Sequence, residues 1–162
     1  MNVVSQLIFN TLTFAIAGTG CLVIGAIVLN NPPLTESPGL VRRLATYLMN
    51  NVAETRRQHT FPELELPCYR IAPERLLSSI EHATDLLGWD IIDLNAPKHR
   101  LKAVVTTPLF KFKDDVEIRL TLAADDSGTE VHIRSSSRVG RADFGANTRH
   151  ILDLLATLER QA

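Results

Sequence analysis

The sequence predicts an α+β protein in which an N-terminal transmembrane helix precedes an antiparallel sheet domain with helices packed on one face. Three patterns indicate this class. Residues 7–29 form an apolar run without Asp, Glu, Lys, Arg or His. Residues 116–122 alternate apolar with polar side chains, as in a strand with one wet face. Residues 76–87 and 151–158 repeat apolar side chains at helical spacing.

The apolar run predicts an uncleaved membrane anchor. As a helix, residues 7–29 span about 34 Å, against roughly 30 Å of bilayer hydrocarbon. A cleaved signal peptide is the alternative, but residues 1–6 lack Lys and Arg, and no small-x-small cleavage site precedes Asn30. A lipoprotein is a further alternative because Gly18-Thr19-Gly20 precedes Cys21, although Gly18 stands where Leu is usual.

The anchor has a candidate contact face and a weak orientation signal. Gly18, Cys21 and Gly25 lie on one side of the helix, where a second membrane helix is able to approach closely. Small residues are also common in membrane helices that make no such contact. The nearest basic residues, Arg42 and Arg43, follow the helix, and the positive-inside rule alone then favours a cytoplasmic domain.

The chain divides into an anchor over residues 1–30, a linker with an amphipathic helix over residues 31–60, and a sheet domain over residues 61–162. Prolines 32, 33 and 38 predict an extended linker. The helix is expected to be capped by Ser37 and to continue to about Ala53.

Two placements of this amphipathic helix are open. Its apolar stripe is expected at Val41, Leu44, Leu48 and Val52, and Arg42 and Arg43 flank the stripe. The helix therefore either lies at the membrane surface with these arginines among the headgroups, or packs on the domain.

The domain is expected in the order strand, helix, four strands, helix. Turn residues separate segments with strand or helical periodicity. In chain order these are strand 63–71, helix 73–87, strands 89–94, 101–107, 116–122 and 129–138, and a helix from about residue 143. About 130 residues lie outside the membrane segment, which suits one domain with one core.

A candidate binding site lies where the last strand meets the last helix. Alternation from Val131 and Ile133 points Ser135 and Ser137 inward, where hydroxyls either satisfy backbone groups or line the mouth of a pocket. The surrounding side chains and the helix start resemble an anion site for a phospholipid headgroup, with the candidate residues Arg134, Arg138, Arg141 and Asn147. The alternative is a structural turn in which Asp143 caps the helix and pairs with Arg141 or Arg138.

A second candidate surface is the connection between two of the strands. Phe110 and Phe112 alternate there with lysines, so these rings either meet a membrane or a partner, or cover the core. Asp114 and Asp115 are adjacent in a strand and are expected on opposite faces, which is unsuited to joint acid–base catalysis.

Composition and spacing exclude several functions. A net charge of −1 without a long basic block argues against nucleic acid. The five histidines lack metal-ligand spacing and are expected at the surface, so neither a metal nor another cofactor is implied. The Gly140 to Gly145 spacing lacks the Lys of a phosphate loop, and no Ser occupies a nucleophile elbow. We therefore expect a protein that is not an enzyme. Cys21 and Cys68 are not expected to pair.

Several motifs resemble one known family. They are Pro38-Gly-Leu-Val-Arg-Arg-Leu44, Asn51-Val-Ala-Glu-Thr55, Phe61-Pro-Glu-Leu64, Leu87-Gly-Trp89, Thr106-Thr-Pro108, Phe112-Lys-Asp-Asp115 and the run from Arg134 to Asn147. Together they resemble the DUF1499 family of bacterial and plastid proteins over residues 38–160. The resemblance implies a periplasmic or thylakoid-lumenal domain, against the charge signal, but implies no reaction and no catalytic residues.

The expected function is therefore that of a non-enzymatic, single-pass protein of the bacterial inner membrane with a periplasmic domain. It would be an accessory or assembly subunit that contacts other integral membrane proteins. The alternative is a binding module for lipid or another amphipathic anion. A hydrolase using Ser135 to Ser137 with Asp114 or Asp115 lacks a positioned base.

Overall fold

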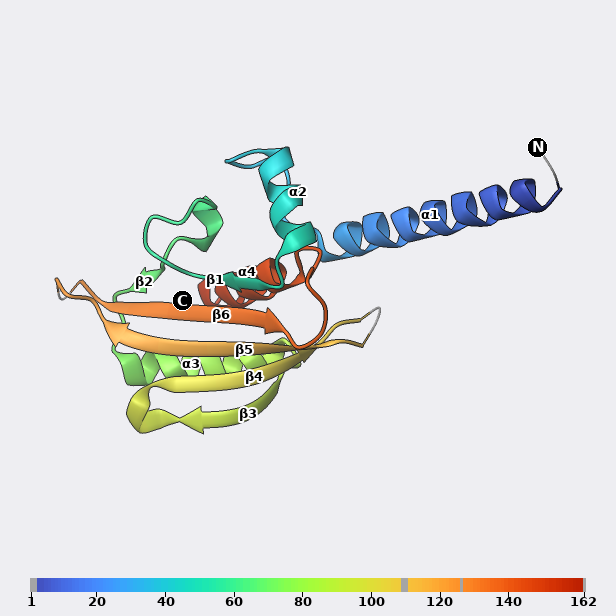
Figure 1. The fold of residues 1–162 in the computed structure, drawn as a ribbon. Coiled ribbons are helices and arrows are strands. Elements are labelled where there is room, and N and C mark those ends of the chain that lie inside the picture. The colour runs from blue at the N-terminus through green and yellow to red at the C-terminus, as the bar shows by residue number, and fades with distance from the viewer. Residues whose placement is uncertain (1–2, 109–110, 126, 162) are drawn as a thin grey trace.

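The fold is an antiparallel sheet backed by two helices, from which one long helix projects (Figure 1). The computed structural model describes residues 3–108, 111–125 and 127–161. The elements are α1 (Val3–Asn30), α2 (Leu40–Met49), β1 (Val52–Glu54), η1 (Pro62–Leu64), β2 (Cys68–Tyr69), α3 (Pro73–Leu86), β3 (Asp90–Asn95), η2 (Ala96–Lys98), β4 (Arg100–Thr106), β5 (Lys113–Leu122), β6 (Thr129–Ser137) and α4 (Ala146–Glu159). The α+β prediction is confirmed.

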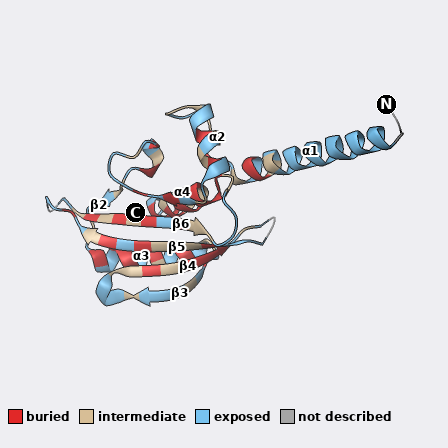
Figure 2. Ribbon diagram, in the orientation of Figure 1, coloured by how far each residue is buried: buried red, intermediate tan, exposed pale blue. Residues whose placement is uncertain are grey.

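The sheet has the strand order β1-β6-β5-β4-β3, and β2 also pairs with β6. Every pairing is antiparallel, and β5 aligns with β6 from Asp114↔Ser137 to Leu122↔Thr129. The alternation predicted for residues 116–122 sets the inner face, because Val116, Ile118 and Leu120 are buried in the core that β5 shares with α3 and α4. Figure 2 shows this burial on the ribbon. The space between sheet and helices is filled by fully buried side chains, among them Ile80, Leu101, Ile133, Ile151 and Leu154.

The strand predicted over residues 63–71 is wrong. Residues 62–64 form a turn of 3-10 helix, and only the two residues of β2 pair with β6. Pro62 and Pro67 lack the N–H that a ladder needs. The Glu65 carboxylate instead accepts the backbone N–H groups of Gln58 and His59, at 2.7 and 2.8 Å.

The second helix is shorter than predicted at both ends. It begins after Gly39 rather than at a Ser37 cap, and it ends at Met49 rather than near Ala53. The residues that follow form β1 instead, where Val52 pairs with Ser136 of β6. Pairing with a strand more than eighty residues away therefore overrides the local helical period.

Of the two placements left open for α2, packing of its apolar stripe on the domain is wrong. Arg43 and Tyr47 face the domain and are fully buried, whereas Val41 is 83% exposed and Leu48 is 42% exposed. Arg43 is therefore turned into the domain instead of toward headgroups, whereas Arg42 is exposed and the apolar residues Val41 and Leu48 face outward.

Arg43 fixes this orientation through an extensive set of contacts. Its guanidinium forms a bidentate ion pair with Glu63, at 2.5 and 2.9 Å, and lies over the Phe61 ring, 4.5 Å from its centroid. It also donates to the Tyr47 hydroxyl and to the backbone carbonyls of Pro33, Glu36 and Ser37. One side chain thus joins the linker, α2 and η1.

The last turn of α1 is fixed to the domain. Ala26 and Ile27 are buried, and the Asn30 amide donates to the carbonyls of Asp143 and Phe144 at 3.4 and 3.0 Å. Pro32 packs on Gly145, whose φ is +84° and where an added Cβ would lie 2.6 Å from the proline ring. Only glycine combines that backbone conformation with so close an approach.

The rest of α1 is uncovered, with residues 4–22 all exposed (Figure 2). The helix Val4–Asn30 is long and apolar enough to cross a membrane, as an anchor or as a signal sequence. Only 11% of its apolar window is buried, so it is not a core helix of the domain.

Replacing Arg43 with Leu is expected to lower the free energy of unfolding by about 3 kcal/mol, because Glu63 and three linker carbonyls lose their donor. Denaturant unfolding of the detergent-solubilised chain, followed by the fluorescence of its single tryptophan, measures this loss. Trp89 is buried in the core and reports on it directly. The matched control is Arg42→Leu at the exposed neighbour; equal losses for both variants would contradict the role given to Arg43.

Candidate functional site

A buried polar cluster lies where β5 and β6 meet the first turns of α4. Alternation along β6 continues from Val131 and Ile133 to Ser135, which is fully buried as predicted. Asn147 and His150 reach the same place from α4 and are also buried. The sheet and helix therefore enclose a patch of polar groups at one end of an otherwise apolar core.

Asn147 organises the cluster through its amide. Its Oδ1 accepts a hydrogen bond from the Ser135 hydroxyl at 2.6 Å. Its Nδ2 donates to the Ser137 hydroxyl at 3.0 Å and to the Asn51 carbonyl at 2.8 Å. Both donors and the acceptor are satisfied, so Asn147 fastens α4 to β6 and to the residue that leads into β1.

Asp114 is the member of the cluster that lacks partners. It lies on β5 and is 1% exposed, and its two carboxyl oxygens accept no hydrogen bond from the residues that the structure describes. Burial raises the pKa of Asp114, more than the nearby Ser137 hydroxyl lowers it. The buried His150 ring lies beside it, with Nδ1 3.8 Å from Asp114 Oδ2.

His150 corrects the expectation that the histidines lie at the surface. Its ring is buried edge-on to Trp89, with the centroids 6.0 Å apart. Burial lowers the pKa of His150 to about 4. Burial thus favours the neutral forms of both His150 and Asp114. The signal for the buried histidine was its helical spacing to Asn147, Ile151 and Leu154.

These residues do not form a catalytic relay. Ser135 Oγ lies 3.2 Å from His150 Nδ1, the same nitrogen that Asp114 approaches. In a catalytic triad the serine hydroxyl contacts one nitrogen of the histidine ring, and the carboxylate accepts a hydrogen bond from the other nitrogen. Ser135 also has no exposed surface, so this arrangement offers a substrate no reachable nucleophile.

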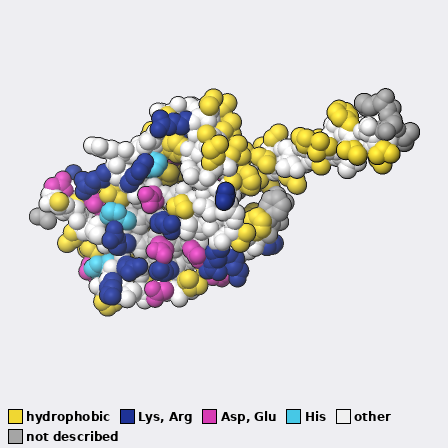
Figure 3. Space-filling view, in the orientation of Figure 1, with side chains coloured by type: hydrophobic (Ala, Val, Ile, Leu, Met, Phe, Trp, Pro, Cys, Tyr) yellow, Lys and Arg dark blue, Asp and Glu magenta, His cyan; other side chains and the backbone are white. Residues whose placement is uncertain are grey.

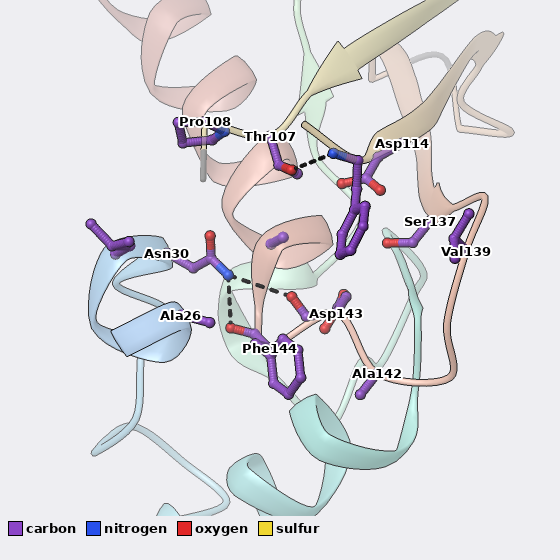
Figure 4. A pocket seen from close by; sticks show the side chains of 13 residues that line it. Ala26, Asn30, Thr107, Pro108, Asp114, Ser137, Val139, Ala142, Asp143 and Phe144 are labelled. Carbon is purple, nitrogen blue, oxygen red and sulfur yellow. Dashed lines mark hydrogen bonds between the residues drawn. The ribbon is translucent and has the colours of Figure 1, made fainter. Parts of the chain in front are cut away.

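A small hollow opens beside the cluster, between the end of α1 and the start of α4 (Figure 4). Ala26, Leu29 and Phe144 form part of its apolar wall, and Asp114 and Ser137 lie on its polar side. Its cavity volume is about 50 Å³, which holds a water or two and is far below the several hundred Å³ typical of ligand pockets.

The three predicted arginines do not gather at this hollow. Adjacent strand residues point to opposite faces of the sheet, so Arg134 lies on the outer face while Ser135 points inward. Arg134 is exposed there and donates to Ser136 Oγ on the same face. Arg138 forms a bidentate pair with Asp115, which lowers the pKa of that carboxyl. Arg141 is exposed in the loop that follows β6.

The N-cap of α4 is Gly145 rather than Asp143, because the helix begins at Ala146 and not near residue 143; Asp143 contacts the helix start from the preceding loop. Its carboxylate accepts the backbone N–H groups of Gly145 and Asn147, at 2.9 and 3.2 Å. Its expected ion pair with Arg138 is replaced by the pair between Arg138 and Asp115.

The remaining candidate residues lie outside the cluster. Gly18 and Cys21 are exposed on α1, and Gly25 is half-buried near its end. Phe112 is 46% exposed beside the hollow, and Phe110 falls outside the described residues. Asp114 and Asp115 face opposite sides of the sheet as predicted. Within the described ranges, no three His, Cys, Asp or Glu residues are grouped to hold a metal ion.

Replacing Asp114 with Asn is expected to raise the free energy of unfolding at pH 7 by about 1–3 kcal/mol, because the amide removes the negative charge that burial disfavours at this position. A raised pKa means that the cost of burying this charge is absent below the ordinary range of the carboxyl and appears as the pH rises through the folded-state value. The gain should therefore shrink toward pH 3. Thermal unfolding of the wild-type and Asp114→Asn chains from pH 3 to 8 measures the difference in their stability. His150 is present in both chains, so the difference reports on residue 114.

The matched control is Asp115→Asn, whose pKa is lowered by Arg138. This variant should lose about 0.5 kcal/mol at pH 7 instead of gaining stability. A gain in both variants would show that the effect follows net charge rather than the burial of Asp114.

Comparison with protein families gives one match. A family model described as "Protein of unknown function (DUF1499)" matches residues 37–158. The match begins after α1 and spans α2, the whole sheet and nearly all of α4. No curated protein matches the chain.

Proposed function

We propose that this chain, which belongs to the DUF1499 family, is a non-enzymatic, single-pass membrane protein. In this proposal it serves as an accessory or assembly subunit of a larger membrane protein complex. Its domain faces the periplasm and its helix lies in the inner membrane, as the sequence resemblance implies. One observation carries the proposal: the anchor is joined rigidly to the domain.

The rigid joint is what a positioned subunit requires. Ala26, Ile27 and Asn30 of α1 belong to the packed domain, and Pro32 is seated on Gly145. A domain that only had to stay near the membrane would need no more than a flexible tether. Here the orientation of the sheet is fixed relative to α1, so a partner that holds the helix also places the domain.

The uncovered part of α1 supplies the surface for such a partner. Gly18 and Cys21 are exposed and Gly25 is half-buried. A Cβ added at Gly18 or Gly25 would have no neighbouring atom within 4 Å among the described residues outside the helix's own backbone. A second membrane helix is able to approach closely along these small residues. At the site predicted for a ligand, the hollow of about 50 Å³ and the full burial of Ser135 favour this role over ligand binding or hydrolysis there.

Replacing Gly18 with Leu is expected to release the chain from its complex, because the larger side chain blocks close helix approach. Mild-detergent extraction from the native membrane, followed by size determination and identification of co-eluting chains, measures this. Gly20→Leu is the matched control, since Gly20 is equally open but lies on the other side of α1. A wild-type chain that elutes strictly alone would overturn the proposal.

Thiol labelling tests the periplasmic placement. Cys68 is exposed in the domain, whereas Cys21 lies within the apolar helix. A membrane-impermeant maleimide should label Cys68 in intact spheroplasts and should fail to label a Cys68→Ser chain. Labelling that appears only after lysis would place the domain in the cytoplasm.

A further inference from the structure

The side of α2 that faces away from the domain is almost entirely apolar. Val41 and Met49 are 83% and 75% exposed, and Leu40 and Leu48 are 49% and 42% exposed. On the helical wheel these four residues share one broad sector with Leu44 and Ala45, and only Arg42 and Thr46 lie beside it. The ten-residue helix α2 therefore exposes to solvent an apolar side of the kind that usually packs in a core.

Rotation of α2 cannot relieve this exposure. Turning the apolar stripe inward would carry Arg43 outward, break its pair with Glu63, and leave the Glu63 carboxylate and the linker carbonyls without their donor. Tyr47, also fully buried, holds the same side inward. The exposed stripe is therefore a fixed feature of the fold and needs a cover from outside the chain.

The position of α2 indicates which cover this is. Figure 1 shows α2 at the end of the domain from which α1 projects, running across the direction of α1. With α1 along the bilayer normal, α2 lies parallel to the membrane surface. Figure 3 shows hydrophobic side chains gathered over α2 and continuing onto α1. The linker that joins them is short and is tied to α2 through Arg43.

Further apolar and basic side chains lie at the same end of the domain. Phe112 and Val139, 46% and 63% exposed, line the hollow beside the last turn of α1. Lys111 and Lys113 flank Phe112, and Arg141 follows Val139; all three are exposed. Apolar residues bordered by cations are typical of a surface that inserts into an interface containing anionic headgroups.

We infer that the outer side of α2 lies in the headgroup region of the bilayer that α1 spans, with lipid as its cover. The inference rests on α1 as an anchor, which belongs to the proposed function. Val41, Leu48 and Met49 enter the boundary with the acyl chains, while Arg42 reaches phosphate at their edge. The domain thus meets the bilayer at two places, through α1 and along α2.

Depth-dependent quenching tests this contact. The full-length chain, with Cys21→Ala and Cys68→Ser, carries a fluorophore on Val41→Cys and is reconstituted into vesicles of phosphatidylcholine and phosphatidylglycerol. Spin-labelled lipids should quench this fluorophore at least several-fold more than one on Leu122→Cys. Leu122 is the matched control because it is 67% exposed but lies at the far end of the β5–β6 pair from Asp114 and Ser137, which line the hollow beside α1.

A second variant guards against adventitious insertion of the label. With the fluorophore on Met49→Cys, replacing Val41 and Leu48 by Glu should return quenching to the level of the Leu122 site. Both positions are exposed, so the emission of Trp89 should stay unchanged and report an intact core.

Equal quenching at residues 41 and 122 would overturn the inference. A fluorophore on residue 41 that is shielded from water-soluble quenchers in native membranes, but not in lipid vesicles, would likewise overturn the inference. That result would assign the outer side of α2 to a protein partner. Strong quenching by lipid in a chain that co-elutes with no other protein would leave the membrane contact standing while the subunit proposal failed.

Discussion

The buried guanidinium of Arg43 is the interaction on which the arrangement of this protein depends. It holds the linker carbonyls of Pro33, Glu36 and Ser37 in one place and pairs with Glu63 from the turn after β1. A buried charge with this many partners stabilises one geometry and strongly destabilises the others. The side of α2 that faces inward, the path of the linker and the exit of α1 all follow from it.

The joint between α1 and the domain shows how the anchor reaches the interior. Pro32 lies on Gly145 at the start of α4, and Asn147 two residues later fastens that helix to β6. Asp114 and His150 lie beneath the same turn, in a setting that favours their neutral forms. The end of α1, the start of α4 and the polar cluster are therefore parts of one packed region.

Local periodicity was enough to predict the apolar helix α1, the helices α3 and α4, and the long strands. It failed where distant partners decide, because α2 is oriented by Glu63 and β1 is formed by β6. At the candidate site, alternation correctly brought Ser135 toward Asn147, but it also separates Arg134 from Ser135. Extending the inward series of β5 back from Val116 would have found Asp114, whereas its lack of partners is visible only in three dimensions.

The rigid joint has a rotational consequence. In a helix each residue turns the chain by about 100°, so the side of α1 that a neighbouring helix grips determines the direction in which the whole sheet points. A partner that translated or rotated α1 within the bilayer would move the domain with it, because Pro32 packs on Gly145 at the junction of the two. Contact of α2 with lipid would resist that movement, and the domain would then have one preferred rotational orientation about the axis of α1.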